Sequence, residues 1–147
     1  MTSTYLLDTD TFRYIANGAS QAARTEFQRR SQDRESVICI SALTEAEVRF
    51  GMAKQGLSRS RRAAIEGLFA NLQILSWGTE EAAAYAEARA TLEAKGLRVS
   101  TMDMLIAAHA IAADAALVSP DKIFAKIGKA TDLFALVNWA TDLQVDE

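Results

Sequence analysis

The stretch TYLLDTDTFRYIANG, residues 4–18, decides the fold class of this chain. It opens with the short apolar run TYLL, which stops at Asp8 and is typical of a buried strand. A helix is expected from Asp10 to Asn17, and Gly18 should end it because glycine readily adopts the left-handed conformation found at helix C-termini. A strand followed directly by a helix is the repeating unit of α/β proteins.

The same alternation continues along the chain. Further strands are predicted at residues 37–40, 72–76, 115–118 and 134–137, and further helices at residues 21–30, 41–52, 59–71, 80–95, 100–113 and 123–127. With one proline and short connections, this order predicts a single domain over residues 1–147. Its centre should be a parallel sheet of four to five strands, with helices on both faces.

The helix predicted at residues 41–52 carries apolar residues with helical spacing. Gly51 marks a weak point near its end. An apolar side of this kind usually faces the protein core. The residues on this side are Ala42, Leu43, Ala46, Phe50 and Ala53.

Length and composition limit the class of protein. A chain of 147 residues, half of them hydrophobic, can enclose one core and bury about 70% of its unfolded surface. The N-terminal residues lack a basic segment and a long apolar run, so neither a signal peptide nor a membrane span is expected, and the predicted location is cytoplasmic. The net charge of −3 argues against a protein that wraps nucleic acid with an overall basic surface.

The chain has one cysteine and one histidine. Cys39 lies in the apolar run VICI, where it is expected to be a buried hydrophobic residue without a disulfide partner. His109 lies in a mostly apolar helix and is expected to have a packing or surface role. A zinc site of histidines and cysteines is therefore excluded, and a nucleophile activated by histidine is disfavoured. No glycine-rich phosphate-binding motif is present.

Four acidic residues fall close to the carboxyl ends of predicted strands. Asp8 directly follows the first strand, and Asp121 directly follows the fourth. Glu47 lies in the helix after the second strand, and Asp103 lies in the first turn of the helix that begins near residue 100. Ligands of open parallel sheets bind at the carboxyl ends of the strands. We therefore expect all four acids to lie on one rim of the sheet.

Four neighbouring carboxylates need a cation, because like charges raise one another's pKa and oppose folding. Carboxylate oxygens are the ligands that Mg²⁺ and Mn²⁺ prefer. The sequence thus predicts a Mg²⁺ site, with Mn²⁺ as a substitute. Its predicted metal ligands, which are also the predicted catalytic residues, are Asp8, Glu47, Asp103 and Asp121.

Two of these acids have a local alternative role. Glu47 and Asp103 each stand three residues after a threonine or serine, which is the spacing of a helix capping box. This alternative is weaker for Glu47, because Ser41 is the better cap of that helix. Asp10 is expected to be a cap or a supporting group, and Asp8 on its own could be a turn residue.

Four blocks of the sequence resemble the PIN-domain ribonucleases, and among them the VapC toxins of bacterial toxin–antitoxin pairs. The blocks are YLLDTDTFRYIANG, CISALTEAEVRFGM, STMDMLIAAHAI, and ALVSPDKIF followed by VNW. They run from Tyr5 to Trp139 in the order and spacing of that family, with Ser41 and Thr44 as supporting residues. One departure is that Ser119-Pro120 precedes the fourth acid, where the family usually has Thr-Asn. Serine keeps the hydroxyl, but proline removes an amide donor.

The resemblance implies a PIN-like three-layer α/β/α fold and a toxin that acts as a Mg²⁺-dependent endoribonuclease through a metal-activated water. Asp8 and Asp103 would bind the metal, Glu47 would hold a metal-bound water or a second ion, and Asp121 would complete the site. The expected partners are RNA, a second copy of the chain in a homodimer, and a VapB-type antitoxin. DNA would be contacted only indirectly, through the antitoxin.

The antitoxin would cover an apolar groove as well as the acidic site. Apolar helix residues could serve either this groove or the internal core, and core is the default. The residues concerned are Val48, Phe50, Met52, Ile65, Leu68 and Phe69. Contacts to the RNA backbone are expected from basic residues. The candidates are Lys122 and Lys126, close to the fourth acid, and the cluster Arg59, Arg61 and Arg62.

Two rival interpretations remain open. LLDTDTF also matches the DxDxT opening of haloacid-dehalogenase-like phosphatases, in which Asp8 would be a phosphorylated nucleophile. That interpretation leaves Glu47 and Asp103 without roles. The other rival is a catalytically inactive PIN-like domain that only binds RNA or a protein partner, which the unusual Ser119-Pro120 pair makes conceivable.

Overall fold

The computed structural model describes residues 2–143. Within them lie five strands and seven helices. The strands are β1 (Ser3–Leu7), β2 (Ser36–Ser41), β3 (Gln73–Leu75), β4 (Ala116–Val118) and β5 (Leu136–Val137). The helices are α1 (Thr9–Asn17), α2 (Gln21–Ser31), α3 (Ala42–Gln55), α4 (Arg59–Ala70), α5 (Thr79–Ala94), α6 (Thr101–Ala112) and α7 (Lys122–Thr131).

The strands form one parallel sheet in the order β3-β2-β1-β4-β5. From β1 the chain adds β2 and β3 on one side, and then returns to add β4 and β5 on the other side. The winding direction therefore reverses between β1 and β4, and open α/β sheets bind ligands at the carboxyl ends of the strands at such a reversal. Leu7 pairs with Val118 at the last position of both strands, so β1 and β4 end at the same level.

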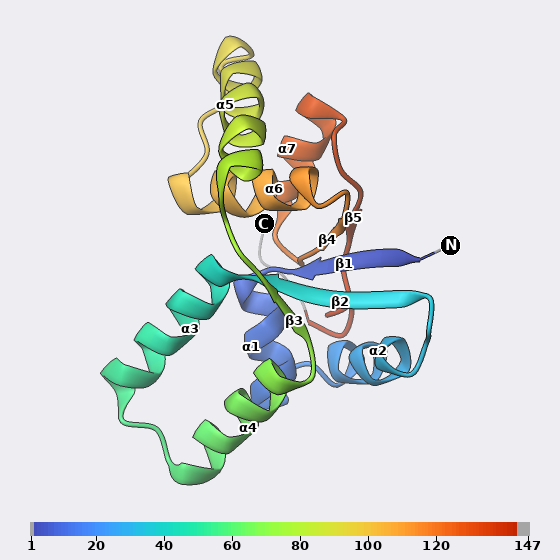
Figure 1. The fold of residues 1–147 in the computed structure, drawn as a ribbon, viewed down its shortest axis with the longest axis vertical. Helices are drawn as coiled ribbons and strands as arrows, with labels where there is room; N and C mark the ends of the chain where they lie inside the picture. The colour runs from blue at the N-terminus through green and yellow to red at the C-terminus, as the bar shows by residue number, and fades with distance from the viewer. Residues whose placement is uncertain (1, 144–147) are drawn as a thin grey trace.

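Two layers of helices cover the sheet, as predicted. Figure 1 shows α5, α6 and α7 on one side of the strands and α1 to α4 on the other. Side chains alternate between the two faces, as the period of a strand requires. Leu6 of β1 packs against the α5–α7 layer, and Leu7 packs against the α1–α4 layer. The three-layer α/β/α architecture is thus confirmed.

The apolar side predicted for α3 was wrong. The buried residues of this helix are Thr44, Val48 and Met52, which are spaced four apart, whereas the Phe50 side of the helix faces outward and Phe50 is 66% exposed. The reason is that Val48 and Met52 bury more apolar surface against the core than the alanines could, and Thr44 lies on the same face with its hydroxyl beside that of Thr9. The helix also continues past Gly51 and ends at Gly56, whose φ of 56° is left-handed.

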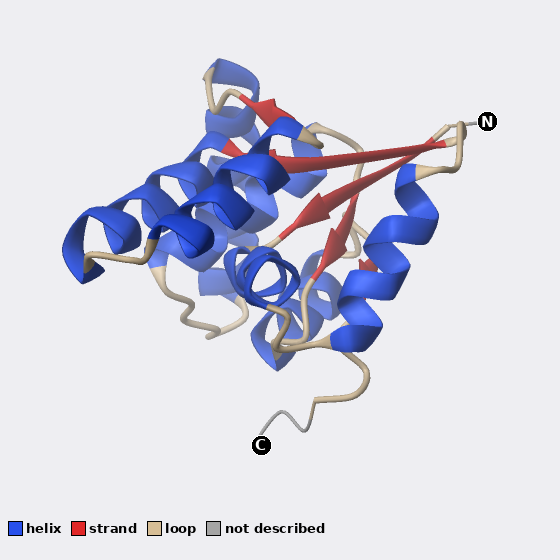
Figure 2. Ribbon diagram, turned by 90° about the horizontal axis from the view of Figure 1, so that it is seen from below, coloured by secondary structure: helices blue, strands red, loops and turns tan. Residues whose placement is uncertain are grey.

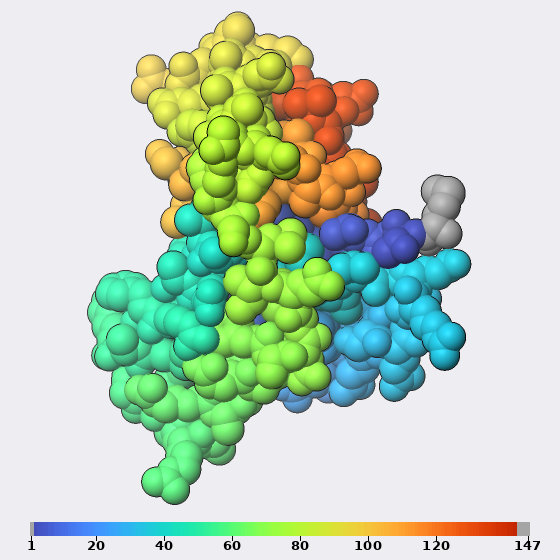
Figure 3. Space-filling view, in the orientation of Figure 1, coloured from blue at the N-terminus to red at the C-terminus, as the bar shows by residue number. Residues whose placement is uncertain are grey.

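Other differences from the predicted boundaries are small. Helix α1 begins one residue early because Asp8, and not Asp10, is its cap. Helix α7 is longer than the predicted residues 123–127. The loop that joins α3 to α4 projects away from the sheet (Figures 2 and 3). Among the helices of the described part, none has the length and apolar character that crossing a bilayer requires.

Candidate active site at the switch point of the sheet

Asp8 lies at the carboxyl end of β1, beside the end of β4. Its backbone amide donates to the carbonyl of Val118 at 3.0 Å, which joins the two strand ends. One carboxylate oxygen, Oδ1, caps α1 by accepting from the Thr11 amide at 2.8 Å. The other, Oδ2, accepts from the hydroxyl of Ser119 at 2.6 Å. The carboxylate is therefore held from both sides of the switch point.

Burial makes the Asp8 carboxyl a weaker acid than usual. The residue is only 4% exposed. This burial raises the pKa of Asp8 from 3.8 to about 6, although hydrogen bonds from Ser119 and Thr11 offset part of the rise. Burial disfavours the charged form because the carboxylate loses its water. A bound cation would favour the ionised form again, so the environment of Asp8 suits a metal ligand.

Ser119 connects Asp8 with the fourth acidic residue. Its hydroxyl accepts from the amide of Asp121 at 3.0 Å while donating to Asp8. Asp121 in turn caps α7, since its Oδ1 accepts from the Ile123 amide at 3.0 Å. Both contacts of Ser119 are made by its hydroxyl, and the amide that donates to it belongs to Asp121, the residue after Pro120. The proline therefore costs neither of them.

Tyr14, which the sequence analysis did not single out, lies in the field of the same acids. Burial raises the pKa of its phenol, and the negative charges of Asp10, Asp8 and Asp121 raise it further. Asp8 and Asp121 thus act on one phenol from the ends of two strands. The spacing of Tyr14 one helical turn after Asp10 is the only sequence signal for this position.

Glu47 reaches the N-terminus of α1 from α3. Its Oε1 accepts a hydrogen bond from the hydroxyl of Thr9 at 2.8 Å, and this hydroxyl also lies 3.2 Å from Oγ1 of Thr44. Ser41 caps α3 by accepting from the Leu43 amide, which removes the need for a capping role of Glu47. The sequence analysis missed Thr9, whose only signal was its place directly after Asp8.

Asp103 is held locally. The hydroxyl of Ser100 donates to its Oδ2 at 2.8 Å, and its own amide donates back to Ser100 Oγ at 3.2 Å. The local alternative from the sequence is thus half realised, because the carboxylate binds the capping hydroxyl and not the backbone amide. In the described residues no hydrogen bond or ion pair joins Asp103 to Asp8, Glu47 or Asp121.

The residues present fit a hard cation. Within residues 2–143 no three side chains of the His, Cys, Asp or Glu type lie close enough together to form a complete metal site. Mg²⁺ does not require one, because it takes one or two carboxylates and keeps several waters. Asp8 uses two of about four lone-pair positions in hydrogen bonds, and every candidate donor in the site is an oxygen. The donor set fits Mg²⁺ or Mn²⁺.

Comparison with known proteins identifies the family. A family model described as "PIN domain" matches residues 5–130, most of the chain. This chain belongs to the PIN-domain family. The match excludes the phosphatase interpretation of the DxDxT motif.

Relatives of this PIN domain include ribonucleases. It is 30% identical over 115 residues to ribonuclease VapC2 of Rickettsia felis, covering 78% of this chain and 84% of the relative. It is 30% identical over 106 residues to the tRNA(fMet)-specific endonuclease VapC of Salmonella typhimurium, covering 72% and 77%. A chain in the crystal structure of VapBC2 from Rickettsia felis bound to a promoter DNA fragment superposes with a TM-score of 0.82 at 28% identity, covering 92% of this chain and 98% of that one.

This PIN domain has a groove with a mixed polar and apolar lining. It has a volume of about 540 Å³ and lies between α1, α3 and α4, with Arg13 and Arg61 among its lining residues. Of the residues considered for such a groove, Val48, Met52 and Ile65 line it. Val48 and Met52 are also buried in the core, together with Leu68 and Phe69, and Phe50 lies outside both core and groove.

The basic residues predicted to contact RNA are exposed in this PIN domain. Lys122 and Lys126 lie in α7, which Asp121 caps, so they are on the helix that begins at the site. The cluster Arg59, Arg61 and Arg62 lies in α4, on the projecting part of the molecule, and only Arg61 lines the groove.

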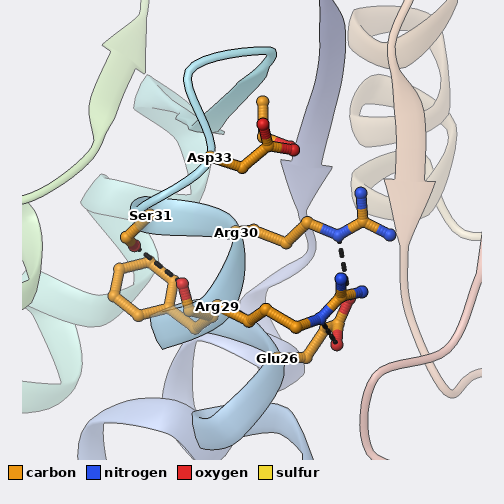
Figure 4. Close-up of polar contacts among 7 residues, drawn as sticks. Glu26, Arg29, Arg30, Ser31 and Asp33 are labelled. Carbon is orange, nitrogen blue, oxygen red and sulfur yellow. Dashed lines mark hydrogen bonds and ion pairs between the residues drawn. The ribbon is translucent and has the colours of Figure 1, made fainter.

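A second charged cluster of this PIN domain lies near the opposite edge of the sheet (Figure 4). Arg29 and Arg30 in α2 both bind Glu26, at 2.6 and 2.8 Å. The cluster precedes β2, so it lies toward the amino ends of the parallel strands. Arg29 is exposed, Glu26 and Arg30 are partly buried, and the Arg30 guanidinium also lies over the Tyr5 ring in β1, 4.9 Å from its centre.

His109 has a packing role, as expected. It is 2% exposed in α6, and burial lowers its pKa. Its Nδ1 has no hydrogen-bond partner within the described chain. Cys39 is likewise buried, and burial raises the pKa of its thiol to about 12, which leaves it unreactive.

Proposed function

We propose that this PIN domain is the toxin of a VapBC-type toxin–antitoxin pair and acts in the cytoplasm as a Mg²⁺-dependent endoribonuclease. The observation that carries the proposal is the buried Asp8 carboxylate at the switch point of the sheet, held by Ser119 from the neighbouring strand. The named activities of the relatives, a ribonuclease and a tRNA-specific endonuclease, give the reaction class. The reaction is hydrolysis of an RNA phosphodiester bond.

Each acidic residue has a distinct task in this proposal. Asp8 and Asp103 would hold the Mg²⁺ ion, with Glu47 and Asp121 orienting water around it. When bound, Mg²⁺ or Mn²⁺ lowers the pKa of water and neutralises charge on the phosphate. Ser119 keeps Oδ2 of Asp8 in one orientation and at the same time holds the main chain of Asp121.

The RNA backbone would be bound by basic residues near this acidic site. Lys122 and Lys126 extend from the helix that Asp121 caps, and they can contact phosphates on either side of the scissile bond. The cluster Arg59, Arg61 and Arg62 would bind a more distant part of the strand. A single-stranded loop would reach the acidic residues at the strand ends more readily than a regular RNA helix, whose bases and backbone are held in a rigid duplex.

The proposed protein partner is a VapB-type antitoxin, with the toxin itself present as a homodimer. Several solved structures of the same fold are VapBC complexes, and two of them contain DNA. The groove between α1, α3 and α4, where Val48, Met52 and Ile65 lie among polar side chains, would be the surface that the antitoxin covers. DNA would be contacted only through the antitoxin.

The test is RNA cleavage by the toxin purified free of antitoxin, with Mg²⁺, with Mn²⁺ and with chelator. Wild type should cleave with either metal and not with chelator. Asp8→Asn and Asp103→Asn should each reduce the rate by more than about a hundredfold, since even the hydrogen-bond partners of metal ligands cost up to that much. Asp114→Asn is the matched control, because Asp114 is exposed and its left-handed backbone tolerates asparagine.

Two results would contradict the proposal, and a third would invalidate the assay. Wild-type protein that cleaves no RNA with any divalent metal would favour the catalytically inactive alternative. Equal cleavage by wild type and the Asp8→Asn variant would remove Asp8 from the site. Loss of cleavage in Asp114→Asn would show that the assay reports folding and not chemistry.

A further inference from the structure

Thr9 makes a contact that the proposed roles of the four acids do not explain. It occupies the first position of α1, directly after Asp8, and its hydroxyl donates to Oε1 of Glu47 in α3 at 2.8 Å. The two residues are 38 positions apart in the sequence. Within residues 2–143 this is the only hydrogen bond or ion pair of the Glu47 carboxylate.

The Thr9 hydroxyl is well placed to fix this carboxylate. A hydroxyl carries one proton and an ionised carboxylate can only accept, so the proton of Thr9 is committed to Glu47. The same oxygen lies 3.2 Å from Oγ1 of Thr44, which is fully buried one turn before Glu47 on α3. The buried Thr44 therefore restricts where the Thr9 hydroxyl can lie.

The main chain of Thr9 is fixed by the same contacts that fix Asp8. Asp8 caps α1, and its amide binds the end of β4. The start of α1 thus positions Asp8 directly and Glu47 through one further hydrogen bond. Two acids from separate elements are linked in this way at one point of the chain.

We propose that Thr9 is a positioning residue that orients Glu47 for divalent-metal binding beside Asp8. This inference rests on the proposed function. Glu47 is partly exposed on α3, and a glutamate without a fixed partner loses more rotamer freedom when it is ordered around a cation. Hydrogen-bond partners that orient metal-binding carboxylates contribute about 10- to 100-fold to metal affinity.

The test is Mn²⁺ binding to antitoxin-free protein, measured by titration calorimetry. Thr9→Val keeps the shape of the side chain but removes the donor, and Thr9→Ser keeps the donor. Thr91→Val is the matched control, because within residues 2–143 the only hydrogen bond of the Thr91 hydroxyl is to the carbonyl of Glu87 in the same helix, α5. Thr9→Val should weaken Mn²⁺ binding by about tenfold, while Thr9→Ser and Thr91→Val should change it by less than about threefold.

A double-mutant cycle shows whether Thr9 acts through Glu47. In a Glu47→Ala background, Thr9→Val should cause no further loss of Mn²⁺ affinity, because its partner is already absent. In RNA cleavage, Thr9→Val should raise the Mg²⁺ concentration needed for half-maximal rate more than it lowers the rate at saturating Mg²⁺. A loss of fold would instead affect both quantities and lower the thermal midpoint.

The outcomes separate this inference from the proposed function. If wild type binds Mn²⁺ and cleaves RNA while Thr9→Val binds Mn²⁺ equally well, only the role of Thr9 is overturned. The role of Thr9 would also be overturned if Thr9→Ser lost as much Mn²⁺ affinity as Thr9→Val, or if Thr9→Val lowered Mn²⁺ affinity further in the Glu47→Ala background. If wild type neither binds Mn²⁺ nor cleaves RNA, both the inference and the proposed function fail.

Discussion

The carboxyl and amino ends of the strands differ in how their charged side chains are accommodated. At the carboxyl ends of β1 and β4, Asp8 is 4% exposed, and its partner Ser119 lies 111 positions away in the sequence. Near the amino ends, Glu26, whose side chain is 24% exposed, is paired with Arg29 and Arg30 within one turn of α2. The Glu26 cluster is favourable wherever it occurs on a helix, whereas a buried charge is retained against its desolvation cost. Such costly charges are typical of functional sites, and the comparison therefore points to the Asp8 edge.

The largest expected effect concerns the dependence of stability on pH. The folded-state pKa of Asp8, about 6, lies above the ordinary value of 3.8, so the folded protein holds a proton between these pH values that the unfolded chain releases. This group therefore stabilises the fold most below about pH 4, and its contribution of about 3 kcal/mol is lost as pH rises through about 6. The measurement is the free energy of unfolding of wild type and Asp8→Asn from pH 4 to 7 in chelator.

The difference between the two proteins isolates Asp8 from the other carboxylates. The difference in the free energy of unfolding between wild type and Asp8→Asn should change by about 3 kcal/mol in favour of Asp8→Asn from pH 4 to 7. Parallel curves for the two proteins would show that Asp8 ionises normally in the fold. The charge of Asp8 at the carboxyl ends of the strands would then carry no desolvation cost.

A smaller effect is expected from the bridge between β1 and β4. Ser119→Ala removes the donor to Asp8 Oδ2 and the acceptor of the Asp121 amide. At pH 7 in chelator it should lower the free energy of unfolding by about 1.5 to 3 kcal/mol, the range for hydrogen bonds to charged groups. Ser119→Thr keeps the hydroxyl and serves as the control, measured by the same urea titration. If both variants match wild type, the short contact does not stabilise the Asp8 carboxylate.

The next smaller effect is expected from Ser100, which caps α6 and binds Asp103. Ser100→Ala should lower the free energy of unfolding by about 1 kcal/mol, because the first turn of α6 loses its acceptor. RNA cleavage should fall less than in Asp103→Asn, since the carboxylate itself remains. Loss of cleavage as large as in Asp103→Asn would mean that Ser100 takes a direct part in the site.

The smallest effect is expected at the amino edge. Glu26→Gln removes both ion pairs of the Glu26 cluster but should change the free energy of unfolding by less than about 1 kcal/mol. RNA cleavage should be unchanged. A large loss of stability, measured by thermal and urea unfolding, would show that the Glu26 cluster is not the inert counterpart of Asp8.

The sequence predicted the parts of the fold that depend on local physics. The left-handed Gly18 ends its helix as expected, and the strand–helix alternation gave the three-layer order. The position of Asp8 after β1 and of Asp121 after β4 followed from the same alternation. These features depend on neighbouring residues, so they can be predicted without a tertiary model.

The hydrogen bonds of the site could not be predicted in the same way. The Ser119–Asp8 and Thr9–Glu47 bonds join residues 111 and 38 positions apart, and they depend on strand order and on the rotation of α3. The apolar pattern of α3 misled because small alanines gain little from burial, while the polar Thr44 is buried with a partner. Whether Asp103 joins the other acids on a metal ion also depends on side-chain positions that no spacing rule supplies.

The central claim is that the buried charge of Asp8 is retained because it binds a divalent metal. The most direct test is the free energy of unfolding of wild type and Asp8→Asn at pH 7, measured in chelator and over increasing Mg²⁺. We expect Asp8→Asn to be the more stable protein in chelator and only wild type to gain stability as Mg²⁺ rises, since a ligand stabilises the state that binds it. An Asp8→Asn variant that is less stable in chelator, or that gains as much from Mg²⁺ as wild type does, would contradict the account.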